Sequence, residues 1–211
     1  PPDEPIGFTD ALFTSTSATC VTGLIVRDTA TAFTRFGQAV ILVLIQFGGL
    51  GIMIFGTLFA LLAGRGLSIR ESLLAGQVLA DGTVGRIARM VKFVVVATLL
   101  VEAAGAIVML PMWQHHQALA ADDPSLAGTV FRSVFHSVSA FCNAGFSLQT
   151  DSLEDRLLRS SYGVWGVMAP LIVLGGLGFP VLYDLARYAW QRAVGRLNRS
   201  DARAGLPVTL H

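Results

Sequence analysis

The sequence predicts an all-α membrane protein in which a unit of helix, re-entrant short helix, loop and helix occurs in tandem. Three observations predict this class: a strongly apolar composition, apolar stretches long enough to cross a bilayer, and an internal repeat. Apolar residues make up 53% of the 211 residues and charged residues only 14%, whereas soluble domains carry about 25% charged residues. The mean hydropathy of +0.63 agrees. The composition therefore argues against an ordinary soluble domain.

The internal repeat consists of two similar segments whose first residues, Phe13 and Phe135, lie 122 positions apart. The first segment reads FTSTSATCVTGL and the second reads FHSVSAFCNAGF, so the two agree at six of twelve positions. The tetrapeptide Gly-Gly-Leu-Gly also occurs twice, at 48–51 and 175–178, each time downstream of one segment. The repeated unit therefore extends beyond the two similar segments.

Each similar segment predicts a short helix that enters the membrane and turns back. The first helix is expected at 8–19 and the second at 126–141. Twelve helical residues span about 18 Å, which is too short for a hydrocarbon core of about 30 Å. Irregular backbone at membrane depth is tolerated only where protein buries it or where it lines a water-filled path. We therefore expect two re-entrant pore helices, followed by a first loop at 20–24 and a second loop at 142–146.

The two loops have the features of a cation site made from backbone oxygen atoms. Each contains a glycine, which lets successive carbonyl groups take orientations that other residues resist. Neither loop contains a carboxylate, which argues against a divalent-cation site and leaves monovalent cations. The alternative is ordinary close packing of small residues between helices, and the repeat makes it less favoured. The expected ligands are the carbonyl groups of Val21, Thr22, Gly23, Asn143, Ala144 and Gly145.

Long apolar runs predict three membrane spans around these loops. Basic residues cluster in the polar stretch 64–92 and again at 187–203, which the positive-inside rule assigns to the cytoplasm. The residues 113–125 are then expected at the outer surface. The expected spans are 36–63, 91–112 and 162–190, with Pro170 and Pro180 expected to kink or interrupt the last. The expected divisions are 1–63 for the first repeat without its outer helix, 64–90 for a cytoplasmic linker, and 91–211 for the second repeat with a basic tail.

Two polar features within these ranges suggest contacts. Glu102 interrupts the second span, where an unpaired ionisable group is costly. We favour a structural role, with hydrogen bonding to a neighbouring pore helix, over a place on the ion path. Ser68 and Glu71 fit a capping box that opens a short helix. That helix either rests on the bilayer or forms a docking surface for a cytoplasmic regulatory subunit.

Several other functions receive little support from the residues. A net charge of +1 does not provide the excess of basic residues that binding to nucleic acid needs. Cys20 and Cys142 occupy matched positions in the repeat, so duplication explains them better than a disulfide does. The adjacent His115 and His116 do not suit joint ligation of a metal. No nucleophile, base and orienting group occur together, and His136 is interpreted as a hydrogen-bonded pore-helix residue. No nucleotide-binding loop of the Gly-x-x-x-x-Gly-Lys type is present.

Four runs of sequence together resemble the Trk/Ktr/HKT superfamily of potassium transporters. They are SATCVTGL from position 17, GGLGIM from 48, FHSVSAFCNAGFS from 135 and GGLGFPV from 175. The resemblance implies four units of helix, pore loop and helix around one pore, each like a potassium-channel subunit. It places Gly23 and Gly145 at the filter glycines, with Val21, Thr22, Asn143 and Ala144 beside them as potassium ligands. Potassium would be the transported ion, with no organic cofactor in this chain.

The resemblance also implies a cellular setting. Such a protein takes up potassium across the plasma membrane, which is the bacterial inner membrane, as a lipid-embedded multi-pass protein. Uptake is driven by the membrane potential. It forms a homodimer and is gated by cytoplasmic nucleotide-binding regulatory subunits. We expect the first outer helix and the remaining repeats of the pore to lie outside this chain. Two alternatives stay open: transport of sodium or of mixed monovalent cations, and a non-conducting scaffold fragment of a membrane complex.

Overall fold

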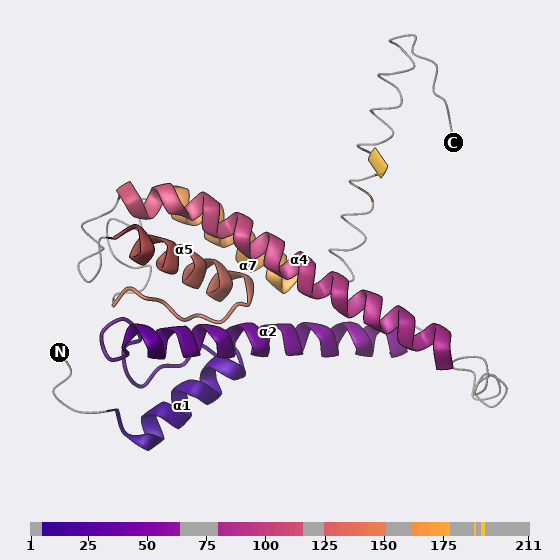
Figure 1. Ribbon diagram of the computed structural model, residues 1–211, viewed down its shortest axis with the longest axis horizontal. Coiled ribbons are helices and arrows are strands. Elements are labelled where there is room, and N and C mark those ends of the chain that lie inside the picture. The colour runs from indigo at the N-terminus through magenta and orange to yellow at the C-terminus, as the bar shows by residue number, and fades with distance from the viewer. Residues whose placement is uncertain are drawn as a thin grey trace, which may run out of the picture.

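The computed structural model describes residues 6–63, 80–115, 125–150, 162–177, 188 and 191–192. All regular secondary structure in these residues is helical (Figure 1). The elements are α1 (Phe8–Thr19), α2 (Arg35–Ala63), α4 (Ala80–His115), α5 (Leu126–Phe141) and α7 (Tyr162–Gly176). The all-helical class is therefore confirmed for the part of the chain that the structure describes.

The two short helices have the lengths that the sequence predicts. Helix α1 has 12 residues and α5 has 16, and both begin and end at the expected residues. Ser125 caps the N-terminus of α5, because its Oγ accepts a hydrogen bond of 3.0 Å from the Gly128 amide. Helix α1 follows Gly7 and has no such side-chain cap. The N-terminal end of α5 is therefore better stabilised than that of α1.

Two longer helices meet the requirements of a membrane span by length and composition. These segments are Arg35–Phe55 in α2 and Val91–Gln114 in α4. Helix α4 begins at Ala80, earlier than the expected span at 91, because backbone hydrogen bonds can continue a helix where side chains are polar. Helix α7 contains Pro170 without being interrupted by it. Most of the rest of the expected third span, including Pro180, and the capping box at Ser68 lie outside the described residues.

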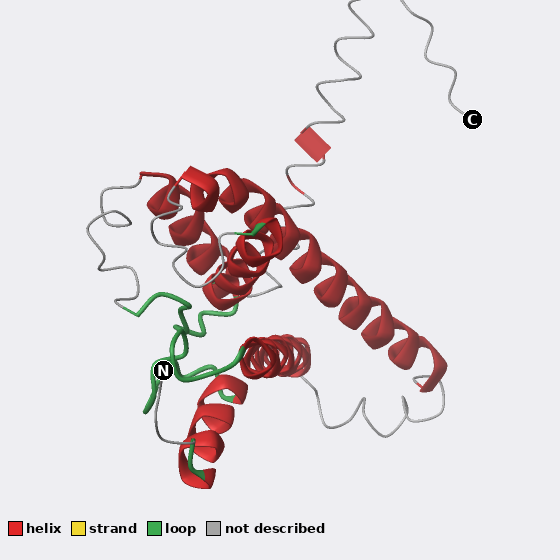
Figure 2. Ribbon diagram, turned by 60° about the vertical axis from the view of Figure 1, so that its left-hand side comes forward, coloured by secondary structure: helices red, strands yellow, loops and turns green. Residues whose placement is uncertain are grey.

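The helices enclose α5 far more than α1. Helix α5 contacts α4, α7 and α2, whereas α1 contacts α2 (Figure 1). One buried cluster joins α4, α5 and α7 and includes Met109, Phe141 and Leu171. A second cluster joins the two repeats and includes Ile41, Ile45 and Phe135. Figure 2 shows the loops that follow α1 and α5 gathered between the two halves of the molecule.

Candidate ion-binding loops

The first loop begins with a specific helix-ending motif. Cys20 is the C-cap of α1 and still has helical backbone angles, with φ −82° and ψ −2°. The Val21 amide then donates to the Ala18 carbonyl at 3.2 Å, and the Thr22 amide donates to the Ser17 carbonyl at 3.0 Å. This pair of bonds defines the Schellman motif, which satisfies the last carbonyl groups of a helix. The end of α1 is thus set by hydrogen bonds over five residues.

The second loop repeats this motif at the end of α5. The Asn143 amide donates to the Ala140 carbonyl at 3.1 Å, and the Ala144 amide donates to the Ser139 carbonyl at 2.8 Å. Cys142, the C-cap of α5, has φ −71° and ψ −7°. Each bond has its counterpart 122 residues earlier. The sequence repeat is therefore also a repeat of backbone structure.

Both loops contain left-handed residues at matched positions. Val21 has φ 56° and Asn143 has φ 58°, while Gly23 has φ 75° and Gly145 has φ 72°. Glycine adopts such angles freely and asparagine tolerates them, but a β-branched valine there is an outlier that costs about 1–3 kcal/mol. In an extended strand, successive carbonyl groups point to opposite sides. The left-handed residues are not extended, so the carbonyl groups of the two loops do not follow this alternation. A strained valine beside a glycine is typical of a functional segment.

The two loops touch each other at their glycines. A Cβ added to Gly23 would lie 2.6 Å from the Ala144 carbonyl oxygen and 3.2 Å from the Gly145 Cα. A Cβ added to Gly145 would lie 3.3 Å from the Gly23 Cα. Residues far apart in the sequence are therefore brought within van der Waals distance, as a shared site requires. Side chains at either position would separate the loops.

The glycine tetrapeptides hold the ends of the short helices. A Cβ added to Gly48 would overlap the carbonyl oxygen of Thr19, the last residue of α1. A Cβ added to Gly175 would overlap the carbonyl oxygen of Phe141, the last residue of α5. The glycines at these positions therefore allow two backbones to approach closely. Gly49 provides a further contact, because its Cβ would lie 2.5 Å from the Cys142 Sγ of the other repeat.

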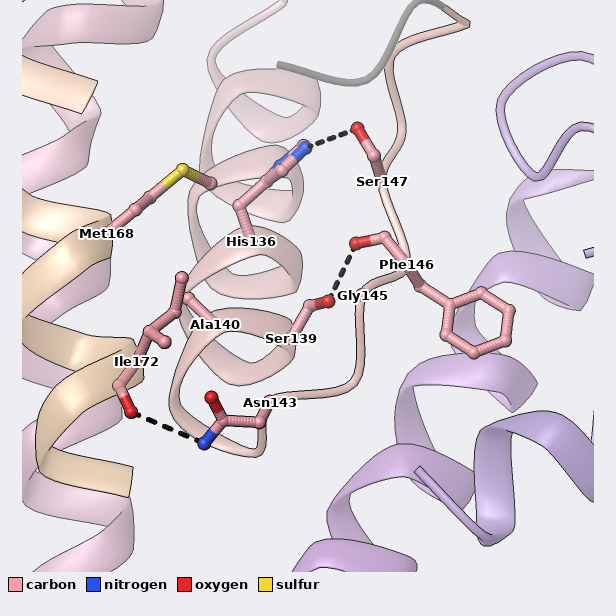
Figure 3. Close-up of a pocket in the computed structure, with 9 residues that line it drawn as sticks. All are labelled: His136, Ser139, Ala140, Asn143, Gly145, Phe146, Ser147, Met168 and Ile172. Atoms are coloured by element: carbon pink, nitrogen blue, oxygen red, sulfur yellow. Dashed lines mark hydrogen bonds between the residues drawn. The ribbon is translucent and has the colours of Figure 1, made fainter. Parts of the chain in front are cut away.

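Side chains hold the second loop on two sides. Ser139 Oγ donates to the Phe146 carbonyl at 2.6 Å, and Asn143 Nδ2 donates to the Ile172 carbonyl of α7 at 3.3 Å (Figure 3). His136 Nε2 lies 3.3 Å from Ser147 Oγ. A cavity of about 300 Å³ lies between α5, the second loop and α7, lined by the nine residues that Figure 3 labels. The loop is thus tied to both neighbouring helices.

The first loop is held by contacts closer to the surface. Ser17 Oγ and Thr22 Oγ1 form a hydrogen bond of 2.9 Å. Arg27 Nε donates to Asp10 Oδ2 at 3.0 Å, and both side chains are partly exposed. The buried Gln38 Nε2 then donates to the carbonyl groups of the following turn, those of Thr29, Ala30 and Phe33, at 3.1, 3.2 and 3.3 Å. Gln38 therefore fixes the connection from the first loop to α2.

Glu102 lies inside the protein and contacts α5, the neighbouring short helix, as the sequence predicts. It is 4% exposed. Ser137 Oγ donates to the Glu102 carbonyl at 2.7 Å, and the Cys142 thiol lies 3.7 Å from Glu102 Oε1 as its donor. Both partners belong to α5 or its C-cap. The expected hydrogen bonding of Glu102 to its neighbouring short helix is therefore confirmed, and its structural role stays a prediction.

The six expected ligand residues lie in the two touching loops, and their role as potassium ligands stays a prediction. Thr22, Asn143 and Gly145 are exposed, Val21 and Gly23 are half-buried, and Ala144 is buried. Cys20 is an exposed free thiol and Cys142 a buried one. His136 is hydrogen bonded within α5, as expected. Sequence reasoning missed Ser139 and Ser147 as residues that hold the second loop, although the match of Ser139 with Ser17 in the repeat was a usable signal.

Comparisons with known proteins agree with the sequence motifs. The family model described as TrkH, cation transport protein, matches residues 2–196. Ktr system potassium uptake protein B of Bacillus subtilis is 37% identical over 188 residues, which cover 87% of this chain and 39% of that protein. The protein of the same name from Vibrio alginolyticus is 36% identical over 191 residues, with 89% and 39% covered.

A third relative carries a broader name. The potassium/sodium uptake protein NtpJ of Enterococcus hirae is 36% identical over 191 residues, which cover 88% of this chain and 39% of that protein. The chain thus spans about two fifths of the length of these three relatives, each covered to 39%. These relatives are transporters and not enzymes, and the family model covers most of the chain. The chain belongs to the TrkH family of cation transport proteins.

Proposed function

We propose that this chain forms part of a potassium uptake protein and supplies two of the backbone loops that select the ion. The single observation that carries this proposal is the contact between the two loops at Gly23 and Gly145. A site made from backbone oxygen atoms needs two or more loops around one axis. Loops that meet at matched glycines, with matched left-handed residues, support such an arrangement.

The direction of the short helices supports a cation at this place. Both α1 and α5 end at their loops, with Cys20 and Cys142 as C-caps. The C-terminal end of a helix carries a partial negative charge of about half an elementary charge. Two such ends at one site attract a cation and repel an anion. The carbonyl groups of the six expected residues then provide the oxygen ligands, and the loops contribute no carboxylate that would favour a divalent ion.

The lengths of the helices support a re-entrant arrangement. Helix α1 has 12 residues and α5 has 16, so they extend about 18 Å and about 24 Å and stop short of a full bilayer. Large apolar side chains of α2 and α4, including Phe47, Phe55 and Leu100, are exposed, which suits contact with lipid or with further helices. We therefore propose the divisions 1–63, 64–90 and 91–211 described above, in a multi-pass protein of the bacterial inner membrane.

The length of the related proteins supports a larger pore. The relatives named as potassium uptake proteins are much longer than this chain, and two loops enclose only part of an ion path. We propose that further units of the same polypeptide complete the ring. Two relatives are named as proteins of a Ktr system, which supports gating by cytoplasmic nucleotide-binding regulatory subunits. A homodimer is part of the same proposal.

The test of the proposed function uses the full-length protein in cells that lack their own potassium uptake. The protein should restore growth at low potassium and carry rubidium. Gly145→Asp should reduce rubidium uptake to background, because it forces a side chain and a charge into the contact between the loops. Gly51→Ala is the matched control, since a Cβ there meets no atom within 4 Å. Unchanged rubidium uptake in Gly145→Asp would reject the proposal.

A second candidate is transport of sodium or of both ions, because one relative is named as a potassium/sodium uptake protein. Competition by sodium against rubidium uptake separates the two functions. Strong competition at equal concentrations favours mixed transport, and weak competition favours potassium. A non-conducting scaffold would instead show normal amounts of protein in the membrane and no uptake of either ion.

A further inference from the structure

We propose that His136 is a positioning residue for ion selectivity, which holds the backbone just after the second loop at a fixed distance from α5. This inference rests on the proposed function. The segment concerned is 146–148, named here the return segment, which begins at the last residue of the second loop. Its side chains and its backbone are held from different directions.

The hydrogen bonds of His136 define which ring nitrogen carries the hydrogen. Nδ1 lies 2.8 Å from the Arg132 carbonyl oxygen, and because a carbonyl only accepts, Nδ1 must donate. Nε2 lies 3.4 Å from the Leu148 amide nitrogen, whose hydrogen points at it. Nε2 is therefore an acceptor in a neutral ring, and Ser147 Oγ, at 3.3 Å, can donate to it as well. A single nitrogen atom, Nε2, thus accepts hydrogen bonds from two groups of the return segment.

The His136 ring is itself held in one orientation. Its side chain is 1% exposed. The ring centroids of Trp113 and Phe135 lie 4.8 Å and 5.9 Å from the His136 centroid, and the bond to Arg132 fixes the ring from the helix side. A buried ring with aromatic neighbours and a bonded Nδ1 cannot turn without losing these contacts. Nε2 is therefore a rigid anchor point.

The return segment needs such an anchor on its α5 side. The side chains of Phe146 and Leu148 are buried in the cluster that joins the two repeats, which contains residues of α2 and of α5 and holds the segment by packing. On its other side lies the cavity of about 300 Å³ between the loop, α5 and α7, where packing cannot resist movement. Two side chains of α5, one helical turn apart, form hydrogen bonds with the segment on this side. Ser139 bonds to residue 146, and His136 bonds to residues 147 and 148 (Figure 3).

The first repeat offers a natural control at the matched position. Thr14 is the counterpart of His136, and its hydroxyl donates to the Asp10 carbonyl at 2.8 Å within its own helix. In the first repeat, Arg27 directly follows the corresponding segment 24–26 and pairs instead with Asp10 of α1. Changes at Thr14 should therefore leave the first loop in place. The position of the second loop alone should depend on the residue at the histidine site.

The experiment compares three variants of His136 in the full-length protein. His136→Asn keeps a donor for the Arg132 carbonyl, His136→Phe keeps an aromatic ring beside Trp113, and His136→Gln keeps a polar group near the place of Nε2. The readout is the ratio of rubidium to sodium uptake, divided by the amount of protein in the membrane. His136→Asn and His136→Phe should lower this ratio about three- to tenfold, the range that a lost hydrogen bond produces. His136→Gln should restore most of it.

Thr14→Val, which removes the hydroxyl at similar volume, should leave the ratio unchanged. An unchanged ratio in both His136→Asn and His136→Phe would overturn the inference and leave the proposed function intact. Failure of all three His136 variants to reach the membrane would also overturn it, because the ring would then be required for folding rather than for position. Absence of rubidium uptake by the unaltered protein would instead reject the proposed function itself.

Discussion

The two short helices and their loops share one backbone but differ in what surrounds them. Both loops have the same pair of hydrogen bonds donated by backbone amides, and their left-handed residues have nearly the same φ angles. Phe135 of α5 is fully buried, however, whereas its counterpart Phe13 of α1 is 41% exposed. Helix α5 contacts α2, α4 and α7, and α1 contacts α2. The local backbone of a loop is therefore encoded within the repeat, and its support comes from neighbouring units.

The second glycines of the two tetrapeptides, Gly49 and Gly176, show the reverse difference. Gly49 of the first repeat faces the Cys142 Sγ of the second, at a Cβ distance of 2.5 Å. The matched Gly176 has Asn143 Nδ2 as its nearest neighbour, at 4.0 Å. At this pair, the first-repeat glycine contacts the second repeat and its second-repeat counterpart has more open space. This contrast is expected if a further unit packs against the second repeat in the same way as the second repeat packs against the first. The variants below test whether further units cover these surfaces.

The largest expected effect compares the two phenylalanines in the full-length protein. Phe135→Ala should lower the free energy of unfolding by about 3–5 kcal/mol, because it leaves a cavity in the cluster between the repeats. If another unit covers α1 in the whole protein, Phe13→Ala should cost nearly as much. Thermal unfolding in detergent measures both. A loss for Phe13→Ala of less than about 0.5 kcal/mol would indicate that α1 faces lipid and would break the proposed equivalence.

A smaller effect is expected at the glycines that hold the helix ends. Gly48→Ala and Gly175→Ala should each destabilise the protein by about 1–3 kcal/mol, since each methyl group would overlap a carbonyl oxygen and force the backbone apart. Uptake should fall as well, because the loops follow directly. Gly51→Ala, in open space, should change stability by less than about 0.5 kcal/mol. Unequal losses at Gly48 and Gly175 would show that the two repeats do not use this contact alike.

The smallest effect concerns the strained residue of the first loop. Val21→Asn gives the first loop the residue that the second loop has at the same place. Asparagine tolerates the left-handed angle that Val21 adopts at φ 56°, so the variant should be more stable by about 1 kcal/mol. Unfolding temperature and rubidium uptake are measured together. Lower stability would mean that apolar contacts of the Val21 side chain outweigh the backbone strain.

Local structure could be predicted from the sequence to a large extent, because it depends on neighbouring residues. The helices α1 and α5 have the predicted bounds, and the hydrogen bonds that end them join residues three to five positions apart. The repeated Gly-Gly-Leu-Gly tetrapeptides were also visible in the sequence, although the contacts of their glycines were not predicted. Hydropathy was less informative about the start of α4, which begins at Ala80 and not at the expected residue 91. Hydropathy marks where apolar residues start, and helical hydrogen bonds can start earlier.

The tertiary structure alone decided which of these local pieces meet. The contact of Gly23 with Gly145, the contact of Gly49 with Cys142 and the link from His136 to the return segment join groups that a repeat pattern leaves unpaired. Such contacts depend on how whole helices pack, and packing sums many weak interactions over distant residues. The sequence by itself therefore determined two similar loops, and the packing of α2 against α5 brought them into contact.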